Sequence, residues 1–178
     1  MKTMKKLLAI FIVLVGISTY SFGQVTTSAN ALATIVTPIS LTWEADLNFG
    51  NLAVSSVAGV VTLVPSANIP PSRSQVGGVQ FPNVIGTVTA GKFSVNGTPN
   101  YTYAITLPST DCVIKDNNGA GPDQMIVNTF TSLPTPTGTL DGSGFQTLYI
   151  GANVTVPQSQ TAGLYKSPVP FNVTVNYN

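Results

Sequence analysis

The sequence predicts an all-β fold for residues 24–178, an immunoglobulin-like β-sandwich of antiparallel strands. Three observations predict it. Apolar and polar residues alternate with a period of two in several runs, the pattern of strands with one buried face. Turn-forming Gly, Pro and Asn residues separate these runs at the spacing typical of sandwiches, about 8–12 residues. After residue 23, no stretch repeats apolar residues at helical spacing over three turns.

The chain begins with a predicted secretory signal peptide, residues 1–23. Three lysines precede an apolar run from Leu7 to Val15, and small residues at positions 21 and 23 favour cleavage before Gln24. The apolar run has about ten residues, too few for the roughly 20 that a membrane-spanning helix needs. We therefore expect a protein secreted to the periplasm or cell surface, with no membrane span after signal removal.

Residues 24–178 carry few charges. Four basic and six acidic residues remain after signal removal, and charged residues make up only 7% of the whole chain, against roughly 25% in ordinary globular proteins. The scattered basic residues predict no nucleic-acid partner, because such binding needs clustered Lys and Arg. The surface must instead be covered by Thr, Ser, Asn and Gln. Sparse charge with many Thr and Val suits strands and a surface partly buried against neighbouring molecules.

Alternation and turn residues locate the individual strands within one predicted domain, residues 24–178. Asn96-Gly97 stands between two alternating runs and predicts a hairpin. Gly77-Gly78 and the prolines predict turns. The last run, FNVTVNY, places four apolar residues on one face. The predicted strands are 57–64, 84–89, 93–95, 101–107, 125–130, 148–156 and 171–177.

The residues that most enzymes use are scarce. The chain has no histidine, which removes the usual general base, zinc ligand and partner of a nucleophilic Ser or Cys. Glu44 and Asp46 would share a strand face, either as a carboxylate pair or as a solvated edge. Cys112 is the only cysteine, so it is either a buried thiol or an intermolecular partner. We expect neither an enzyme nor a cofactor.

The segment DNNGAGPD, residues 116–123, resembles part of a calcium loop. An EF-hand needs an oxygen ligand at its fifth position and Glu at its twelfth, where this chain has Ala120 and Val127. Two readings stay open. The segment is either a plain loop or a loose surface calcium site formed by Asp116, Asn118 and Asp123.

Three blocks resemble known proteins: ATIVTPISLTWEADLNFGNL (33–52), FSVNGTPNYTYAITLPS (93–109) and VPQSQTAGLYKSPVPFNVTVNY (156–177). Together they resemble the spore coat protein U-type pilins of the archaic chaperone–usher group. They are also similar to an uncharacterised family of secreted bacterial domains that has no assigned activity. The resemblance covers about half of the chain after the signal peptide.

The pilin resemblance implies an incomplete sandwich whose open groove receives the N-terminal extension of the next subunit. Such head-to-tail contacts propagate into a fibre. The implied donor segment runs from Gln24 to about Ala33, with Val25 and Leu32 as its sizeable apolar residues. The implied partners are further copies or related fibre subunits, and a periplasmic chaperone. The implied groove wall consists of Phe171, Val173, Val175 and Tyr177.

Two functions follow as expectations. The first is an exported structural and adhesive protein, a subunit or accessory component of a pilus-like surface fibre that assembles by β-strand addition. The second is a monomeric secreted binding module that recognises a glycan or protein through loops 65–78 and 111–124. The sequence leaves the ligand and the oligomeric state open.

Overall fold

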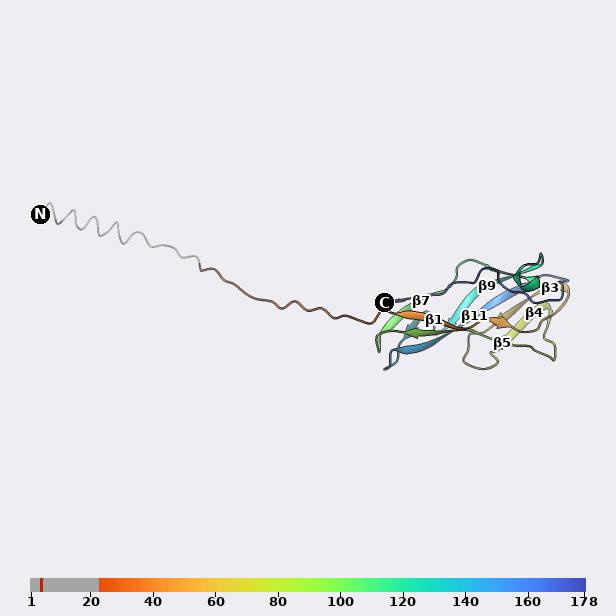
Figure 1. The fold of residues 1–178 in the computed structure, drawn as a ribbon, viewed down its shortest axis with the longest axis horizontal. Coiled ribbons are helices and arrows are strands. Elements are labelled where there is room, and N and C mark those ends of the chain that lie inside the picture. The colour runs from red at the N-terminus through yellow and green to blue at the C-terminus, as the bar shows by residue number, and fades with distance from the viewer. Residues whose placement is uncertain (1–3, 5–22) are drawn as a thin grey trace. The chain divides into compact units, whose positions relative to one another are not determined.

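The computed structural model describes residue 4 and residues 23–178, so the predicted signal peptide lies almost wholly outside the described residues. The chain divides into two units, Met1–Thr34 and Ile35–Asn178. Residues 23–34 of the first unit form no helix or strand, and each of them is exposed. Every described strand belongs to the second unit (Figure 1). Among the described residues, no helix has the length and apolar character needed to cross a membrane.

The second unit has an antiparallel all-β sandwich fold, which confirms the predicted fold class. Its largest sheet has seven strands in the order β1-β6-β11-β3-β4, with β9 also on β11 and β8 on β9. Their bounds are β1 (Ser40–Ala45), β3 (Ala53–Leu63), β4 (Arg73–Gln80), β6 (Gly91–Asn96), β8 (Cys112–Lys115), β9 (Gln124–Leu133) and β11 (Phe145–Val156).

Strand β11 organises this sheet because it is long enough to pair with three others. Residues 145–150 pair with β6 and residues 152–156 pair with β3 along the same edge. The opposite edge pairs with β9. On its inner face, Leu148, Ile150, Ala152, Val154 and Val156 are all at most 1% exposed. The period-two pattern of the sequence thus places a continuous row of buried apolar side chains along β11.

Two small sheets and one short helix complete the fold. A three-stranded sheet has the order β10-β7-β12, and a two-stranded sheet pairs β2 with β5. The helix α2 lies between β8 and β9. Their bounds are β2 (Asn48–Phe49), β5 (Val88–Thr89), β7 (Thr102–Thr106), α2 (Asp116–Gly119), β10 (Thr137–Thr139) and β12 (Thr174–Tyr177).

The buried side chains form two clusters. The first includes Leu63 and Val154 and fills the end of the sandwich where β3, β8, β9 and β11 meet. The second includes Val95 and Tyr103 and lies between the β6–β11 part of the large sheet and the three-stranded sheet. Phe130 packs against both clusters. Burial of these apolar side chains is the main favourable contribution to folding.

The predicted hairpin at Asn96-Gly97 is wrong. Strand β6 pairs with β1 and β11, whereas β7 pairs with β10 and β12, so the turn joins two different sheets. The backbone amide of Gly97 donates to the carbonyl of Gly144, and that of Asn100 donates to the carbonyl of Asp141. These bonds to the loop before β11 hold the connection apart from a tight hairpin, so β7 crosses to the opposite layer.

Two further stretches differ from the expected strands. Of the predicted strand 84–89, only Val88–Thr89 pairs, because Pro82 precedes the stretch and Gly86 has a φ of +68°. Gly77-Gly78, expected as a turn, instead lies inside β4. A Cβ at Gly78 would collide with the carbonyl of Val57, so the glycine permits the close approach of β3 at a shift in register.

Tyr103 provides a test of the second cluster. It is 0% exposed, its hydroxyl donates to Gln146 Oε1 at 2.7 Å, and burial raises its pKa to about 12. An unfolded tyrosine has a pKa of about 10. The buried neutral phenol therefore makes its full contribution to the free energy of unfolding below pH 10. That contribution is lost as the pH rises towards 12.

We expect the urea midpoint of unfolding, measured from pH 8 to 12, to fall more steeply above pH 10 in the wild type than in Tyr103→Phe. Equal slopes in the two proteins would show that the Tyr103 phenol ionises as readily in the folded as in the unfolded chain.

Candidate functional site

The last strand of the chain, β12, is an edge strand. Within the described part of the chain it pairs only with β7. The amide of Asn178 donates towards β7, to the carbonyl of Thr102 at 3.3 Å. Amides of an antiparallel strand point alternately to its two sides. The amides of Val175 and Tyr177 therefore face the unpaired side.

The first strand of the domain, β1, is also an edge strand. It pairs only with β6 among residues 23–178. The amide of Gly97 points to β11, so by alternation the amide of Ser94 points to β1. Since Thr42 is the partner of Ser94, its amide points back to β6. The amides of Leu41 and Trp43 are left facing the unpaired side.

These two edges lie near each other, and we call the space between them the seam. In Figure 1 the C-terminus lies beside the start of β1. Cα atoms of β1 and β12 come within 8 Å of one another, yet no ladder joins the two strands. Paired strands lie about 4.8 Å apart, and a strand inserted between two others needs about 9.6 Å. At its closest approach the seam is therefore narrower than an added strand requires, yet no backbone pairing closes it.

The predicted groove-wall residues lie along the β12 side of the seam. Val175 is 8% exposed, Val173 and Tyr177 are half-buried, and all belong to the second cluster. Phe171 precedes β12 and is half-buried, with its ring 4.9 Å from that of Phe130. It therefore bridges the two clusters.

Across the seam, β1 presents an apolar face that the sequence interpretation did not single out. Leu41 packs on the second cluster, while Trp43, two residues on, is 60% exposed. Trp43 is the register partner of Phe93, which also packs on that cluster. By alternation with Leu41 and by its pairing with Phe93, Trp43 shares their side of the sheet but is left largely uncovered. The alternation of Leu41 and Trp43 with polar neighbours was the available signal.

One end of the seam is closed by the hydroxyl of Tyr177. This hydroxyl donates to the carbonyl of Thr37 at 2.8 Å and accepts from the amide of Thr98 at 2.6 Å. The amide of Thr37 in turn donates to Thr98 Oγ1 at 2.8 Å. Tyr101 packs edge-on against the Tyr177 ring with centroids 5.5 Å apart. The end of the chain is thereby fixed to the segment that leads into β1.

The predicted donor residues belong to the first unit. Val25 is 95% exposed and Leu32 is 91% exposed. Ile35, the first residue of the second unit, is 97% exposed. These three aliphatic side chains stand singly among small and polar residues and are free to contact another surface.

The two candidate carboxylates, Glu44 and Asp46, contact different residues. Glu44 forms an ion pair with Lys92 at 2.7 Å and accepts a hydrogen bond from Ser94. The hydrogen bond and the charge of Glu44 raise the pKa of Lys92. Asp46 lies beyond β1 and accepts from Trp43 Nε1 at 3.2 Å. The structure therefore does not bring the two carboxylates together as a catalytic pair.

The acidic loop is held by its own backbone. Asp116 Oδ1 accepts from the amide of Asp123 at 3.1 Å, and the amide of Asp116 donates to the carbonyl of Asp123 at 3.0 Å. Across the described residues, no three acidic, Cys or His side chains lie together as metal ligands. Cys112 is buried beside Val169, and burial raises the pKa of its thiol.

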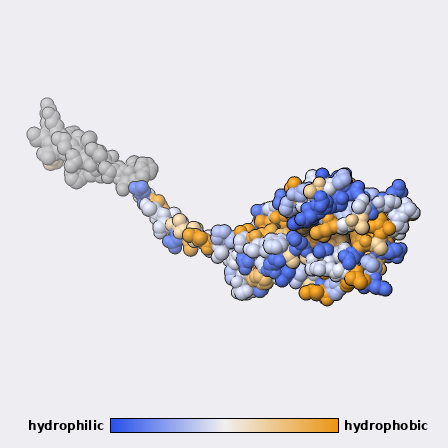
Figure 2. Space-filling model, turned by 45° about the vertical axis from the view of Figure 1, so that its right-hand side comes forward, coloured by the Kyte–Doolittle hydropathy of each residue, from blue (hydrophilic) through white to orange (hydrophobic). Residues whose placement is uncertain are grey.

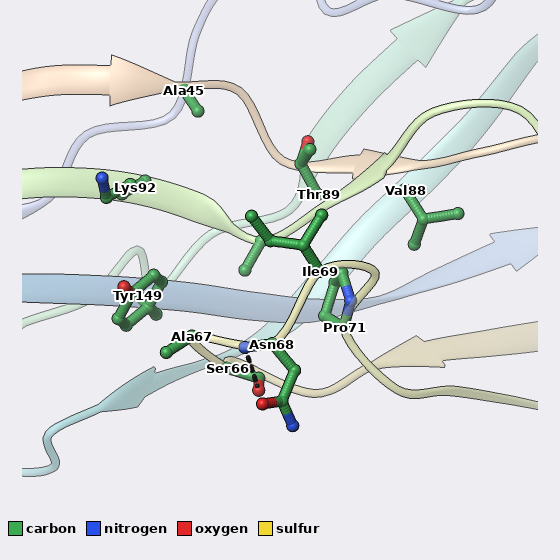
Figure 3. Close-up of a pocket in the computed structure, with 11 residues that line it drawn as sticks. Ala45, Ser66, Ala67, Asn68, Ile69, Pro71, Val88, Thr89, Lys92 and Tyr149 are labelled. Atoms are coloured by element: carbon green, nitrogen blue, oxygen red, sulfur yellow. Dashed lines mark hydrogen bonds between the residues drawn. The ribbon is translucent and has the colours of Figure 1, made fainter.

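A small pocket lies on the other face of the β6–β11 region (Figure 3). It has a volume of about 160 Å³ and a mostly apolar lining. The loop that carries Ser66 and Ile69 arches over strands that contribute Lys92 and Tyr149 (Figure 3). The amide of Asn68 donates to Ser66 Oγ at 3.0 Å and fixes this loop. Pockets for drug-sized ligands have about 300–1,000 Å³, so this one accommodates a single small group.

Hydrophobic residues also appear as separate patches on the domain face in Figure 2.

No curated protein and no solved structure matches the chain. A family model, described as a domain of unknown function (DUF4402), matches residues 39–177 and so spans the strands from β1 to β12. The chain belongs to the DUF4402 domain family.

Proposed function

We propose that this protein is an exported structural and adhesive protein, a subunit or accessory component of a cell-surface fibre that assembles by β-strand addition. The observation that carries the proposal is the pair of unpaired edges at the seam. The resemblance of the chain to spore coat protein U-type pilins supports the same assembly mode. Export through the signal peptide to the periplasm or cell surface, where a chaperone would protect the open edge, belongs to the proposal.

Strand addition would satisfy two features of the seam together. The added backbone would pair with the amides of Val175 and Tyr177 on β12. Its inward side chains would cover Trp43, which is 60% exposed. An unpaired edge is otherwise a site of unwanted association, which native proteins usually block with charge or proline. Neither β1 nor β12 has a proline, and Glu44 is their one charged residue.

The occupant we propose is the segment 24–34 of a second copy. It lies outside the strands of the domain, and its Val25 and Leu32 are more than 90% exposed. Three alanines, at positions 29, 31 and 33, share the parity of Val25. The core beneath the seam is already covered, because Val95 and Leu148 are 0% exposed. An added strand therefore needs only small side chains on its inward face.

The fluorescence of Trp43 tests this proposal directly, because it is the only tryptophan in the chain. We expect a peptide of residues 24–34, added to the domain of residues 35–178, to shift the emission to shorter wavelength. The shift should saturate with concentration as the indole leaves water. The same peptide with Leu32→Asp and Val25→Asp is the control and should cause no shift. An unchanged spectrum with the wild-type peptide would reject segment 24–34 as the occupant.

The pocket favours a second candidate function, a binding module that recognises a small group such as one sugar ring. It lies beneath loop 66–71, within the loop predicted for recognition, and combines the Tyr149 ring with the charged group of Lys92. Aromatic rings with a few polar groups are common in such sites.

A glycan array distinguishes this candidate from the fibre. Tyr149→Ala should abolish a glycan signal in protein that circular dichroism shows to be folded, with a lower melting temperature because Tyr149 packs on the first cluster. Tyr165→Phe, whose hydroxyl bonds lie in a separate loop, is the matched control and should retain the signal. A wild-type protein that binds no glycan on the array would remove the binding-module candidate.

A further inference from the structure

The seam has a closing contact at one end, and its position suggests a role beyond holding the C-terminus. Tyr177 is the last residue of β12, while Thr37 lies three residues before β1. The single hydroxyl of Tyr177 connects them, with the amide of Thr98 as a third member at 2.6 Å. Both edges that strand addition would use are therefore tied together at this point.

The local sequence is arranged around this hydroxyl. A Cβ added at Gly97 would collide with it, so the absence of a side chain there lets the phenol reach the turn. Thr98 contributes three hydrogen bonds. Its amide donates to the Tyr177 hydroxyl, and its Oγ1 accepts from the amide of Thr37 at 2.8 Å and donates to the carbonyl of Thr37 at 3.3 Å. Each polar atom of the contact is thus satisfied in the closed form.

The spacing of the edges makes this contact an obstacle to assembly. The strands approach within 8 Å between Cα atoms, and an inserted strand needs about 9.6 Å between its neighbours. The edges must therefore part by at least about 1.6 Å at their closest approach before a strand can enter. Parting them breaks the hydrogen bond between Tyr177 and Thr37, which spans the seam.

We propose that the Tyr177 hydroxyl is a latch that holds the seam closed and slows strand addition. The proposal rests on the fibre function argued above. Tyr177→Phe keeps the ring and its packing against Tyr101 but removes both hydrogen bonds of the hydroxyl. The energetic bias towards the closed seam falls, so the entering segment meets a lower barrier.

The test compares the rate at which the domain of residues 35–178 binds the peptide of residues 24–34, followed by Trp43 emission in stopped flow. Within the described residues, every strand pair and both buried clusters lie in this domain, so it retains the sandwich described above. We expect Tyr177→Phe to bind about tenfold faster than the wild type, since each lost hydrogen bond is modest in net strength. Thr98→Val, which removes only Oγ1, should give a smaller increase.

Tyr165→Phe is the control, because it removes a phenol whose partners, Gln160 and Thr161, belong to another loop. Its binding rate should equal that of the wild type. Equal rates for Tyr177→Phe and the wild type, or slower binding by the variant, would overturn the latch. If none of the proteins binds the peptide, the fibre proposal fails and the latch fails with it.

Amide exchange of Thr37 separates the latch from the fibre function. This amide donates to Thr98 Oγ1 at 2.8 Å and reports opening of the contact without any partner. It should exchange faster in Tyr177→Phe than in Tyr165→Phe. Unchanged exchange would mean that the hydroxyl does not hold the contact closed, whatever the assembly measurements show.

Discussion

Removing residues 24–34 from the protein of residues 24–178 should abolish the proposed self-association and leave the domain folded. The segment carries the exposed side chains of Val25 and Leu32, and every strand pair lies outside it. Burying a Val or Leu side chain is worth about 1.5–3 kcal/mol. Because Val25 and Leu32 differ in parity, only one of them faces the seam in an added strand, so loss of its burial alone should weaken association by at least about tenfold. Light scattering after size exclusion measures the molar mass, and thermal unfolding verifies the fold.

Point variants make the same test without shortening the chain. If residues 24–178 assemble as proposed, Val25→Asp combined with Leu32→Asp should give a monomer at the same concentrations. Val84→Asp is the matched control, because Val84 is 74% exposed but lies in a loop of the domain. It should assemble as the wild type does. Assembly that persists after deletion of the segment would contradict its role as donor.

Leu148→Ala should lower the free energy of unfolding by about 3 kcal/mol. Leu148 is 0% exposed and lies on the inner face of β11, beneath the seam. The loss combines the transfer free energy of the removed methyl groups with the cavity that they leave. For a domain of this size the melting temperature should fall by about 10 °C.

The control for that change removes the same atoms from an exposed site. Leu133 is 49% exposed and lies on the strand that pairs with the opposite edge of β11. Leu133→Ala should change the free energy of unfolding by less than about 0.5–1 kcal/mol. Equal losses in urea titrations of the two variants would contradict the assignment of the core to the inner face of β11.

The fold class could be predicted because apolar and polar residues alternate with a period of two in several runs of the sequence. Runs such as Leu148–Val156 alternate without interruption, and the structure buries one face of each. The pairing of strands was less accessible, since it depends on contacts between distant residues. Asn96-Gly97 has the composition of a hairpin turn, yet bonds from this connection to the Asp141–Gly144 loop direct β7 into the other sheet.

The structural meaning of a glycine pair was similarly ambiguous in the sequence. Gly77-Gly78 can form a turn or allow close packing of strands, and only the nearby Val57 carbonyl decides between them. At the seam, the sequence placed the β12 residues on one face but not the exposed Trp43 opposite them. The position of Tyr177 beside Thr37 joins residues 140 positions apart, and no local pattern encodes that contact.

Strand addition at the seam is tested most directly by amide hydrogen exchange of β12, resolved by residue in NMR spectra. The amides of Val175 and Tyr177 face the unpaired edge, whereas that of Asn176 faces β7 and is the internal reference. On saturation of the domain with the peptide of residues 24–34, we predict strong new protection at Val175 and Tyr177 and little change at Asn176. Bound peptide without protection at Val175 and Tyr177 would contradict strand addition at this edge.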